Sequence, residues 1–246
     1  MDLSASHIPL SHVIVLVPAR NEEDLLPRCL RSILRACALL PFNMTYDIIV
    51  AVDSSTDNTR DIAERILDGH GAVVNTDAGC VGQARIHAAE TALLRYGGAA
   101  ENCWIANTDA DCIVPENWLV DQIALAASGV DAVAGIVDVD SFAEHSSGVE
   151  YLFRTSYVIH ADGSHPHVHG ANLGIRADAY LKAGGWAGLA TAEDHDLWQR
   201  LQEAGTRRAS VARLSVTTSG RRVGRAPHGF AGALASHNEC AAVETL

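Results

Sequence analysis

CWIANTDAD, residues 103–111, joins an apolar run directly to a polar turn with two aspartates, and this pattern is the most informative one in the chain. Three other apolar runs, at 13–17, 47–52 and 72–75, also end in polar or acidic residues. All are short and rich in β-branched residues, and their apolar positions are continuous rather than alternating. This pattern is typical of strands that are covered on both faces, as in a parallel sheet.

Helical patterns separate these predicted strands. Apolar residues recur at helical spacing within 26–37, 57–67 and 82–96, which indicates amphipathic helices. Strands that alternate with helices predict an α/β fold with a doubly wound sheet. Ligands of such sheets bind beyond the carboxyl ends of the strands. The polar residues that follow the strands therefore predict a site at that edge.

The two aspartates of the polar turn predict a metal site. Asp109 and Asp111 are separated by one residue at the end of a buried strand, so their oxygens offer a compact set of ligands. Hard divalent cations such as Mg²⁺ and Mn²⁺ prefer oxygen ligands and keep positions open for water or substrate phosphates. An acidic pair alone is a weak signal, and the polar ends of the other strands strengthen it.

Charge and composition narrow the class of protein. The 246 residues carry a formal net charge of −12, which argues against a general nucleic-acid binder or a polybasic membrane anchor. We expect no signal peptide and no transmembrane segment, since no basic-then-apolar leader and no run of about twenty apolar residues is present. The six cysteines lack Cys-x-x-Cys spacing, which favours reduced thiols in a cytoplasmic protein. The oligomeric state is not indicated.

Positive charge is concentrated near the C-terminus. Between Glu203 and Glu239 there is no acidic residue, whereas six arginines lie there, at 207, 208, 213, 221, 222 and 225. A local basic segment in an acidic protein suits a phosphorylated ligand, which arginine can bind with two parallel N–H groups. Charges that protect an edge strand are the alternative.

Six motifs then occur in order: VPARNEE at 17–23, VDSSTDNT at 52–59, GCVGQAR at 79–85, TDAD at 108–111, GANLGIR at 170–176 and EDHDL at 193–197. With these motifs the chain resembles the family 2 glycosyltransferases, which have the GT-A fold. The resemblance spans about residues 12–230. It implies one GT-A domain with a doubly wound mixed sheet, made of a nucleotide-sugar-binding half (12–112) and an acceptor-binding half (113–230). We expect residues 231–246 to form a weakly ordered tail.

The resemblance implies a set of nucleotide-binding residues: Pro18, Ala19, Arg20, Glu22, Asp53, Gly79, Gly82, Arg85, Asp109, Ala110 and Asp111. Asp53 would accept a hydrogen bond from the base. Gly79 and Gly82 would let the backbone approach the nucleotide, and Arg85 would reach a phosphate or close the pocket. Plainer interpretations stay open, in which Asp53 caps a turn and the glycines only form one.

The metal site by resemblance has Asp111 as a direct ligand of Mn²⁺ or Mg²⁺, while Asp109 reaches the ribose or a metal-bound water. The cation would stabilise the departing diphosphate. His228 is the candidate third ligand, and an unrelated loop histidine is an equal alternative. Arg221 and Arg222 are the candidate phosphate-binding residues.

The acceptor side by resemblance has Asp194 as the general base, with Glu193 as the alternate base or an acceptor ligand. His169, Gly170 and Asn172 would line this side. Trp186 would stack on a sugar, or else pack in the core. The histidines at 160, 165, 167 and 169 permit a zinc site, although polar contacts of a loop are the favoured interpretation.

These observations predict a metal-dependent glycosyltransferase that moves a sugar from a nucleotide-diphosphate sugar, with a UDP-sugar favoured, to a hydroxyl of an unknown acceptor. Inversion at the anomeric carbon is the expectation from the resemblance. A sugar-phosphate nucleotidyltransferase is the alternative enzyme. A non-catalytic nucleotide-binding module is the third interpretation, since a fold does not fix a function.

Overall fold

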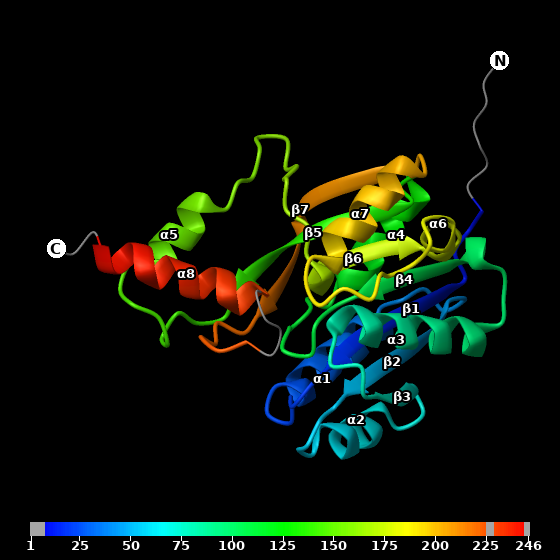
Figure 1. Ribbon diagram of the computed structural model, residues 1–246. Helices are drawn as coiled ribbons and strands as arrows, with labels where there is room; N and C mark the ends of the chain where they lie inside the picture. The colour runs from blue at the N-terminus through cyan, green and yellow to red at the C-terminus, as the bar shows by residue number, and fades with distance from the viewer. Residues whose placement is uncertain (1–7, 225–228, 244–246) are drawn as a thin grey trace.

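The computed structural model describes residues 8–224 and 229–243, with side chains described as far as 238. Within these residues seven strands form one mixed sheet (Figure 1). The strands are β1 (His12–Ala19), β2 (Thr45–Asp53), β3 (Gly71–Thr76), β4 (Cys103–Asn107), β5 (Ala132–Val139), β6 (Leu173–Arg176) and β7 (Arg208–Thr218). The first four are the strands that the apolar runs predict.

The sheet has the order β3-β2-β1-β4-β6-β5-β7. Neighbours are parallel except at β6, which runs antiparallel to both β4 and β5. The carboxyl ends of β1, β2 and β4 therefore meet at one edge, where the polar turns of the sequence lie. This α/β architecture confirms the predicted doubly wound mixed sheet. Strands from before and after residue 112 belong to this one sheet, in which β4 pairs with β6. The division of the chain into two halves at residue 112 stays a prediction.

Helices cover both faces of the sheet (Figure 1). One apolar core joins alternate residues of β1 and β2 to α1 (Leu26–Ala38), α2 (Thr59–Leu67) and α4 (Trp118–Ala127). The other core lies beneath α3 (Val81–Tyr96), α6 (Ala177–Lys182) and α7 (Glu193–Glu203). Burial of each large aliphatic side chain contributes about 1.5–3 kcal/mol, so the central strands are firmly held. Two 3₁₀ turns, η1 (Ala100–Asn102) and η2 (Gly170–Asn172), precede β4 and β6.

The buried face of helix α3 is centred on its small residues, and its large apolar residues lie to one side of that face. Its fully covered residues are the small ones, including Ala84, Ala88 and Ala92, together with Arg85. Small side chains let the helix lie close to β1 and β2. The larger Ile86 therefore packs at the border of this interface and is only partly buried.

Residues after 230 correct the expectation of a tail. Phe230–Val243 forms the helix α8, which packs against α5 (Val149–Ser156) beside the main sheet (Figure 1). Leu234 is buried in a small cluster with Val139 and Phe153, and this apolar contact orders the helix. Residues 244–246 lie outside the described part of the chain. No helix among the described residues has the length and apolar character needed to cross a membrane.

Candidate functional site

A cleft of about 530 Å³ opens at the carboxyl edge of the sheet. It collects most of the residues that the sequence predicts for the site: Pro18, Ala19, Arg20, Glu22, Asp53, Gly79, Arg85, Asp109, Ala110, Asp111, His169, Gly170, Glu193, Asp194 and Arg221. These residues come from segments spread over 200 positions of the chain, and the strand ends bring them together. A pocket with convergent carboxylates and arginines is the default candidate for an active site.

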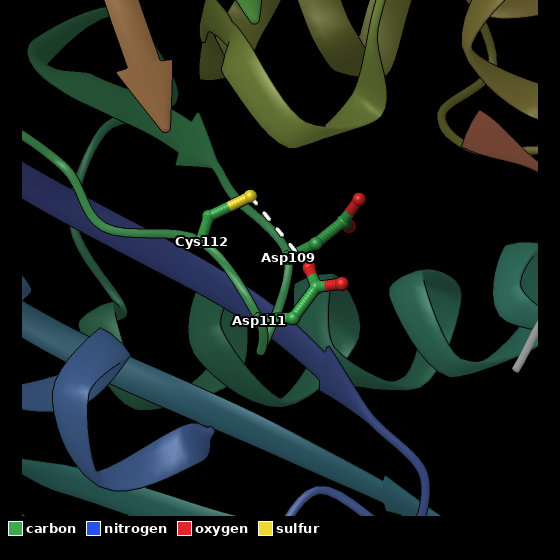
Figure 2. Close-up of side chains that lie close together, drawn as sticks. All are labelled: Asp109, Asp111 and Cys112. Carbon is green, nitrogen blue, oxygen red and sulfur yellow. Dashed lines mark hydrogen bonds between the residues drawn. The ribbon is translucent and has the colours of Figure 1, made fainter. Parts of the chain in front are cut away.

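The turn after β4 carries Asp109 and Asp111 side by side (Figure 2). Ligand atoms of Asp109, Asp111 and Cys112 all lie within 4.8 Å of one another. Helix α1 fixes the backbone of this turn, because Arg28 Nη2 donates to the carbonyl of Asp111 at 3.1 Å and Cys29 Sγ donates to that of Asp109 at 3.3 Å. The two carboxylates are therefore held by backbone anchors that leave their oxygens for other partners.

The donor atoms of this turn fit a hard divalent cation. Burial raises the pKa of the Cys112 thiol well above its ordinary value, and the neighbouring aspartates raise it further. Its soft sulfur is also a poor match for a hard cation. Two carboxylates then remain, which is the oxygen chemistry that Mn²⁺ and Mg²⁺ prefer. Within residues 8–224 and 229–238, whose side chains are described, this is the only close group of three candidate ligands.

Asp111 lies in a strongly charged environment. Burial raises its pKa to about 6, with Asp109 and Glu22 adding to the rise and Arg221 opposing it. Thr218 Oγ1, at the end of β7, donates to Asp111 Oδ1 at 3.3 Å. A positive charge near this carboxylate is therefore needed to keep it ionised in its buried position.

Arg85 is buried at the centre of the site and lines the cleft, while the expectation that it reaches a phosphate or closes the pocket stays a prediction. Its Nη2 donates to Asp109 Oδ1 at 2.6 Å, and its Nε lies 3.4 Å from Glu193 Oε1. The guanidinium also lies over the ring of Trp186, at 5.0 Å from the ring centroid. Arg85 Nη1 is a buried donor for which the described part of the chain supplies no hydrogen-bond partner.

The first turn of α7 supplies the second pair of carboxylates. Asp194 Oδ2 accepts a hydrogen bond from the backbone N–H of Gly170 at 2.8 Å, and Oδ1 accepts one from the N–H of His195 at 2.8 Å. Glu193 is buried, which raises its pKa, although Arg85 opposes the rise. Asp194 is thus oriented by the backbone, whereas Glu193 is committed to an ion pair.

Asp53, the expected base-binding residue, is used largely by its own chain. Its Oδ1 accepts hydrogen bonds from Thr76 Oγ1 at 2.8 Å and from the N–H of Gly79 at 3.1 Å. Its Oδ2 accepts one from the N–H of Cys80 at 3.1 Å. The carboxylate faces the cleft and also fixes the loop before α3, where Gly79 has a φ of 62° that favours glycine.

Two residues expected at the acceptor side lie behind the cleft wall. Asn172 is buried, and its amide accepts from Trp118 Nε1 at 2.9 Å and donates to the carbonyls of Ile136 and Leu214, both at 2.9 Å. This corrects its assignment as an acceptor-binding residue, because its polar atoms hold β5 and β7 together. Trp186 is also buried, and Arg85 covers its ring, so no face is offered to a sugar.

Three residues assigned to the donor side need correction or lie outside the description. Gly82 does not line the cleft but packs against the segment 187–189, where a Cβ would meet the carbonyl oxygen of Ala187 at 2.2 Å. Arg222 is exposed and lies off the cleft, with its backbone N–H bound to Glu144. His228, the candidate third metal ligand, lies outside the described residues.

The histidine segment forms a stack rather than a metal site. The rings of His165, His167 and His169 follow one another at about 6 Å between centroids, and Tyr157 stacks on His167 at 3.9 Å. His169 Nε2 is 2.8 Å from the Tyr157 hydroxyl. Burial lowers the pKa of His169 to about 4. These contacts support the interpretation of polar loop contacts over a zinc site.

The sequence reasoning missed several residues of the site. Thr218 lines the cleft and donates a hydrogen bond to Asp111. It is a polar residue at the end of a strand, which is the same signal that predicted the two aspartates. Val137, Val168 and Phe230 add an apolar wall beside His169. This wall had no local signal, because β5, the loop before β6 and α8 meet only in the folded chain.

Known proteins are similar to this chain in sequence and in fold. The model of glycosyl transferase family 2 matches residues 14–183. An undecaprenyl-phosphate 4-deoxy-4-formamido-L-arabinose transferase of Proteus mirabilis (strain HI4320) is 26% identical over 127 residues, which is 50% of this chain and 36% of the relative. The transferase of the same name from Pseudomonas fluorescens (strain Pf0-1) is 27% identical over 128 residues. The chain thus spans little more than a third of these relatives.

Solved structures share the fold over most of the chain. TarS 1-349 of S. aureus in complex with UDP-GlcNAc has a TM-score of 0.65 at 17% identity, covering 87% of this chain and 60% of that one. The mannosyltransferase PcManGT of Pyrobaculum calidifontis, in complex with GDP-Man and Mn2+, has a TM-score of 0.62 at 19% identity, covering 96% and 72%. The sheet is therefore that of the GT-A fold, as predicted.

Proposed function

The chain belongs to glycosyl transferase family 2, and on that premise we propose that it transfers a sugar from a nucleotide-diphosphate sugar to an acceptor hydroxyl. The observation that carries the proposal is that two carboxylate pairs, Asp109 with Asp111 and Glu193 with Asp194, face one cleft. Transfer needs a charged site for the leaving diphosphate and a base for the attacking hydroxyl, and the two pairs suit these two tasks. Family membership favours this reaction over a nucleotidyltransferase or a non-catalytic module.

The donor side of the proposal uses the residues that follow β1, β2 and β4. The segment 18–22 and Asp53 would bind the nucleoside, with a UDP-sugar favoured. Asp109 and Asp111 would hold Mn²⁺ or Mg²⁺, for which their oxygens are suitable ligands. A cation bound there would supply positive charge to the departing diphosphate. Arg221 would add a second positive charge from the loop that follows β7.

Asp194 is the proposed general base. Backbone N–H groups of Gly170 and His195 fix its two oxygens in place, and the side chain faces the cleft. Carboxylate lone pairs beyond these hydrogen bonds can take the proton of the acceptor hydroxyl as it attacks the anomeric carbon. Glu193 is the alternate base, but its ion pair with Arg85 disfavours proton transfer. A single base on the acceptor side suits direct displacement with inversion.

The acceptor would approach along the wall that carries His169. Val137, Val168 and Phe230 make this part of the cleft apolar, which favours an acceptor with an apolar portion next to its hydroxyl.

The described cysteines are all free, in keeping with the expected cytoplasmic location.

A thermal-shift panel of nucleotide sugars, with and without Mn²⁺, tests the donor assignment. A ligand that binds the native state raises the apparent stability by mass action. We expect a UDP-sugar to raise the melting temperature in a Mn²⁺-dependent manner and the Asp111→Asn variant to lose that dependence. A panel in which no nucleotide sugar stabilises the protein would contradict the proposal. Undiminished Mn²⁺ dependence in Asp111→Asn would remove the metal assignment.

A further inference from the structure

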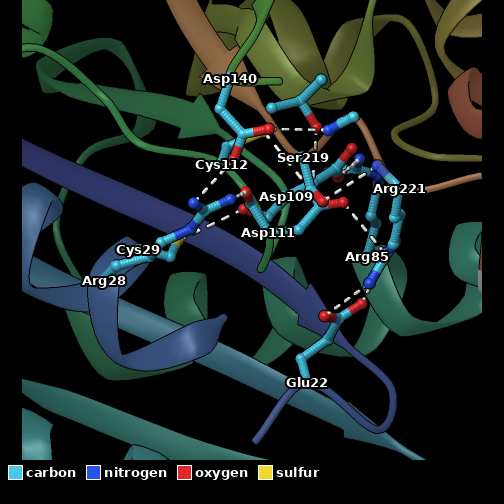
Figure 3. Close-up of polar contacts among 12 residues, drawn as sticks. Glu22, Arg28, Cys29, Arg85, Asp109, Asp111, Cys112, Asp140, Ser219 and Arg221 are labelled. Atoms are coloured by element: carbon cyan, nitrogen blue, oxygen red, sulfur yellow. Dashed lines mark hydrogen bonds and ion pairs between the residues drawn. The ribbon is translucent and has the colours of Figure 1, made fainter. Parts of the chain in front are cut away.

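Arg221 lies against the same carboxylate that the proposed metal site needs (Figure 3). Its Nη2 is 3.0 Å from Asp111 Oδ2 and 2.7 Å from Glu22 Oε1. Its Nη1 donates to Glu22 Oε2 at 2.9 Å. One guanidinium is therefore shared by two carboxylates, on segments that are far apart in the sequence.

This arrangement leaves little room for a second cation. Thr218 binds Asp111 Oδ1, and Arg221 lies against Oδ2, so both oxygens of Asp111 have partners. A divalent ion would have to bind Asp111 within about 2.0–2.2 Å, next to a guanidinium at hydrogen-bond distance from the same carboxylate. The two positive charges would repel each other in a partly buried site. Metal and Arg221 therefore compete for Asp111.

The rest of the site does not provide a substitute for Arg221. Arg85 is tied to Asp109 and Glu193 in the interior, and Arg28 is paired with Asp140 at 2.8 Å while its Nη2 binds the carbonyl of Asp111. Among the arginines around the turn, Arg221 contacts the Asp111 carboxylate directly and comes from a loop that follows a strand. Its Nε is a buried donor with no hydrogen-bond partner in the described chain, so this N–H gains a partner only if the side chain moves to an anion.

We propose that Arg221 is a displaceable cation, which neutralises Asp111 in the ligand-free protein and moves onto the diphosphate when a divalent ion takes its place. The inference rests on the proposed metal site at Asp109 and Asp111. It predicts that metal and nucleotide bind cooperatively. The metal alone must break the contact between Arg221 and Asp111, whereas with the nucleotide present the released guanidinium gains a new anionic partner. By linkage each ligand then strengthens the other by the same factor.

Mn²⁺ binding, measured by the electron paramagnetic resonance signal of the free ion, tests this without any turnover. The Arg221→Gln variant should bind Mn²⁺ alone about 10-fold or more tightly than the wild type, because the competing charge is gone. UDP, with its own Mn²⁺ complex accounted for, should strengthen Mn²⁺ binding to the wild type and strengthen it far less in the variant. The Arg213→Gln variant is the matched control. It removes the same charge from an exposed position on β7 and should behave as wild type.

The outcomes separate this inference from the proposed function. Equal or weaker Mn²⁺ binding by folded Arg221→Gln, relative to wild type, overturns the displacement while leaving the metal site standing. Wild-type Mn²⁺ affinity in Asp111→Asn would remove the metal site and the displacement with it. Should Arg221→Gln not fold, Arg221→Met decides. A methionine also removes the charge that competes for Asp111, so we expect tighter Mn²⁺ binding than in the wild type, and an unchanged affinity overturns the inference.

Discussion

Arg85 Nη2 lies 2.6 Å from Asp109 Oδ1, so the first carboxylate of the proposed metal site is paired with a guanidinium from α3. The same guanidinium reaches Glu193 in the first turn of α7. The proposed donor and acceptor sides of the cleft are thus joined through one buried side chain.

Arg85→Met should destabilise the protein, because it leaves Glu193 buried without its ion-pair partner. Breaking a buried pair costs about 3–5 kcal/mol, and we expect the lower end because the Asp109 side chain is 39% exposed. Urea denaturation measures the loss. In a double-mutant cycle with Glu193→Gln the two losses should be clearly less than additive. Additive losses would show that the pair does not contribute.

Asp194→Asn should keep its affinity for the donor and lose transfer by about 10²–10⁴-fold, the usual contribution of a positioned general base. The amide oxygen can still accept the hydrogen bond from Gly170, so the fold should persist. Steady-state rates together with donor titration separate the two effects. Glu193→Gln is the matched comparison and should lose less. A fully active Asp194→Asn would exclude Asp194 as the base.

His169 should make the protein less stable in mild acid. Its pKa is lowered to about 4 by burial, from an ordinary value of 6.5, with His167, His195 and His165 adding to the lowering and Asp194 opposing it. Between these two values the unfolded chain binds a proton that the folded chain does not, so the free energy of unfolding falls as the pH drops, by at most about 3 kcal/mol.

The His169→Gln variant checks this dependence. Glutamine does not titrate, so the difference in unfolding free energy between pH 7 and pH 5 should be smaller than in the wild type. His165 and His167 also have lowered pKa values and should leave a residual slope. Identical slopes in the two proteins would show that His169 does not contribute.

Gly82→Ala should destabilise the protein by about 1–3 kcal/mol, the usual cost of overpacking. The added Cβ would meet the carbonyl oxygen of Ala187 at 2.2 Å, and this contact is with backbone that cannot easily move. Thermal unfolding measures the effect. Gly232→Ala is the control, since no atom lies within 4 Å of its Cβ and a helical alanine should leave the stability unchanged or higher. Equal melting temperatures would contradict the packing argument.

The sequence alone determined the strands, the helices between them and the edge at which the polar turns gather. Strand burial and helix periodicity are local properties, so VIVLV at 13–17 and CWIA at 103–106 identify β1 and β4 without any knowledge of the fold. The polar residues that follow each strand can also be found from the sequence. Because parallel strands place their carboxyl ends at one edge, these residues are expected to lie together. Asp109 and Asp111 are therefore predictable from local pattern.

The contacts of those residues, by contrast, depend on how the whole chain folds. Arg221 pairs with Glu22 although 199 positions separate them, and Arg85 is buried between the carboxylates of Asp109 and Glu193. The buried contacts of Asn172 and Trp186, and the packing of α8 against α5, likewise join segments that are distant in the sequence. The partner of a charged or aromatic side chain is set by which segments the sheet order and helix packing bring together. That choice is a property of the whole chain, and no short window of sequence contains it.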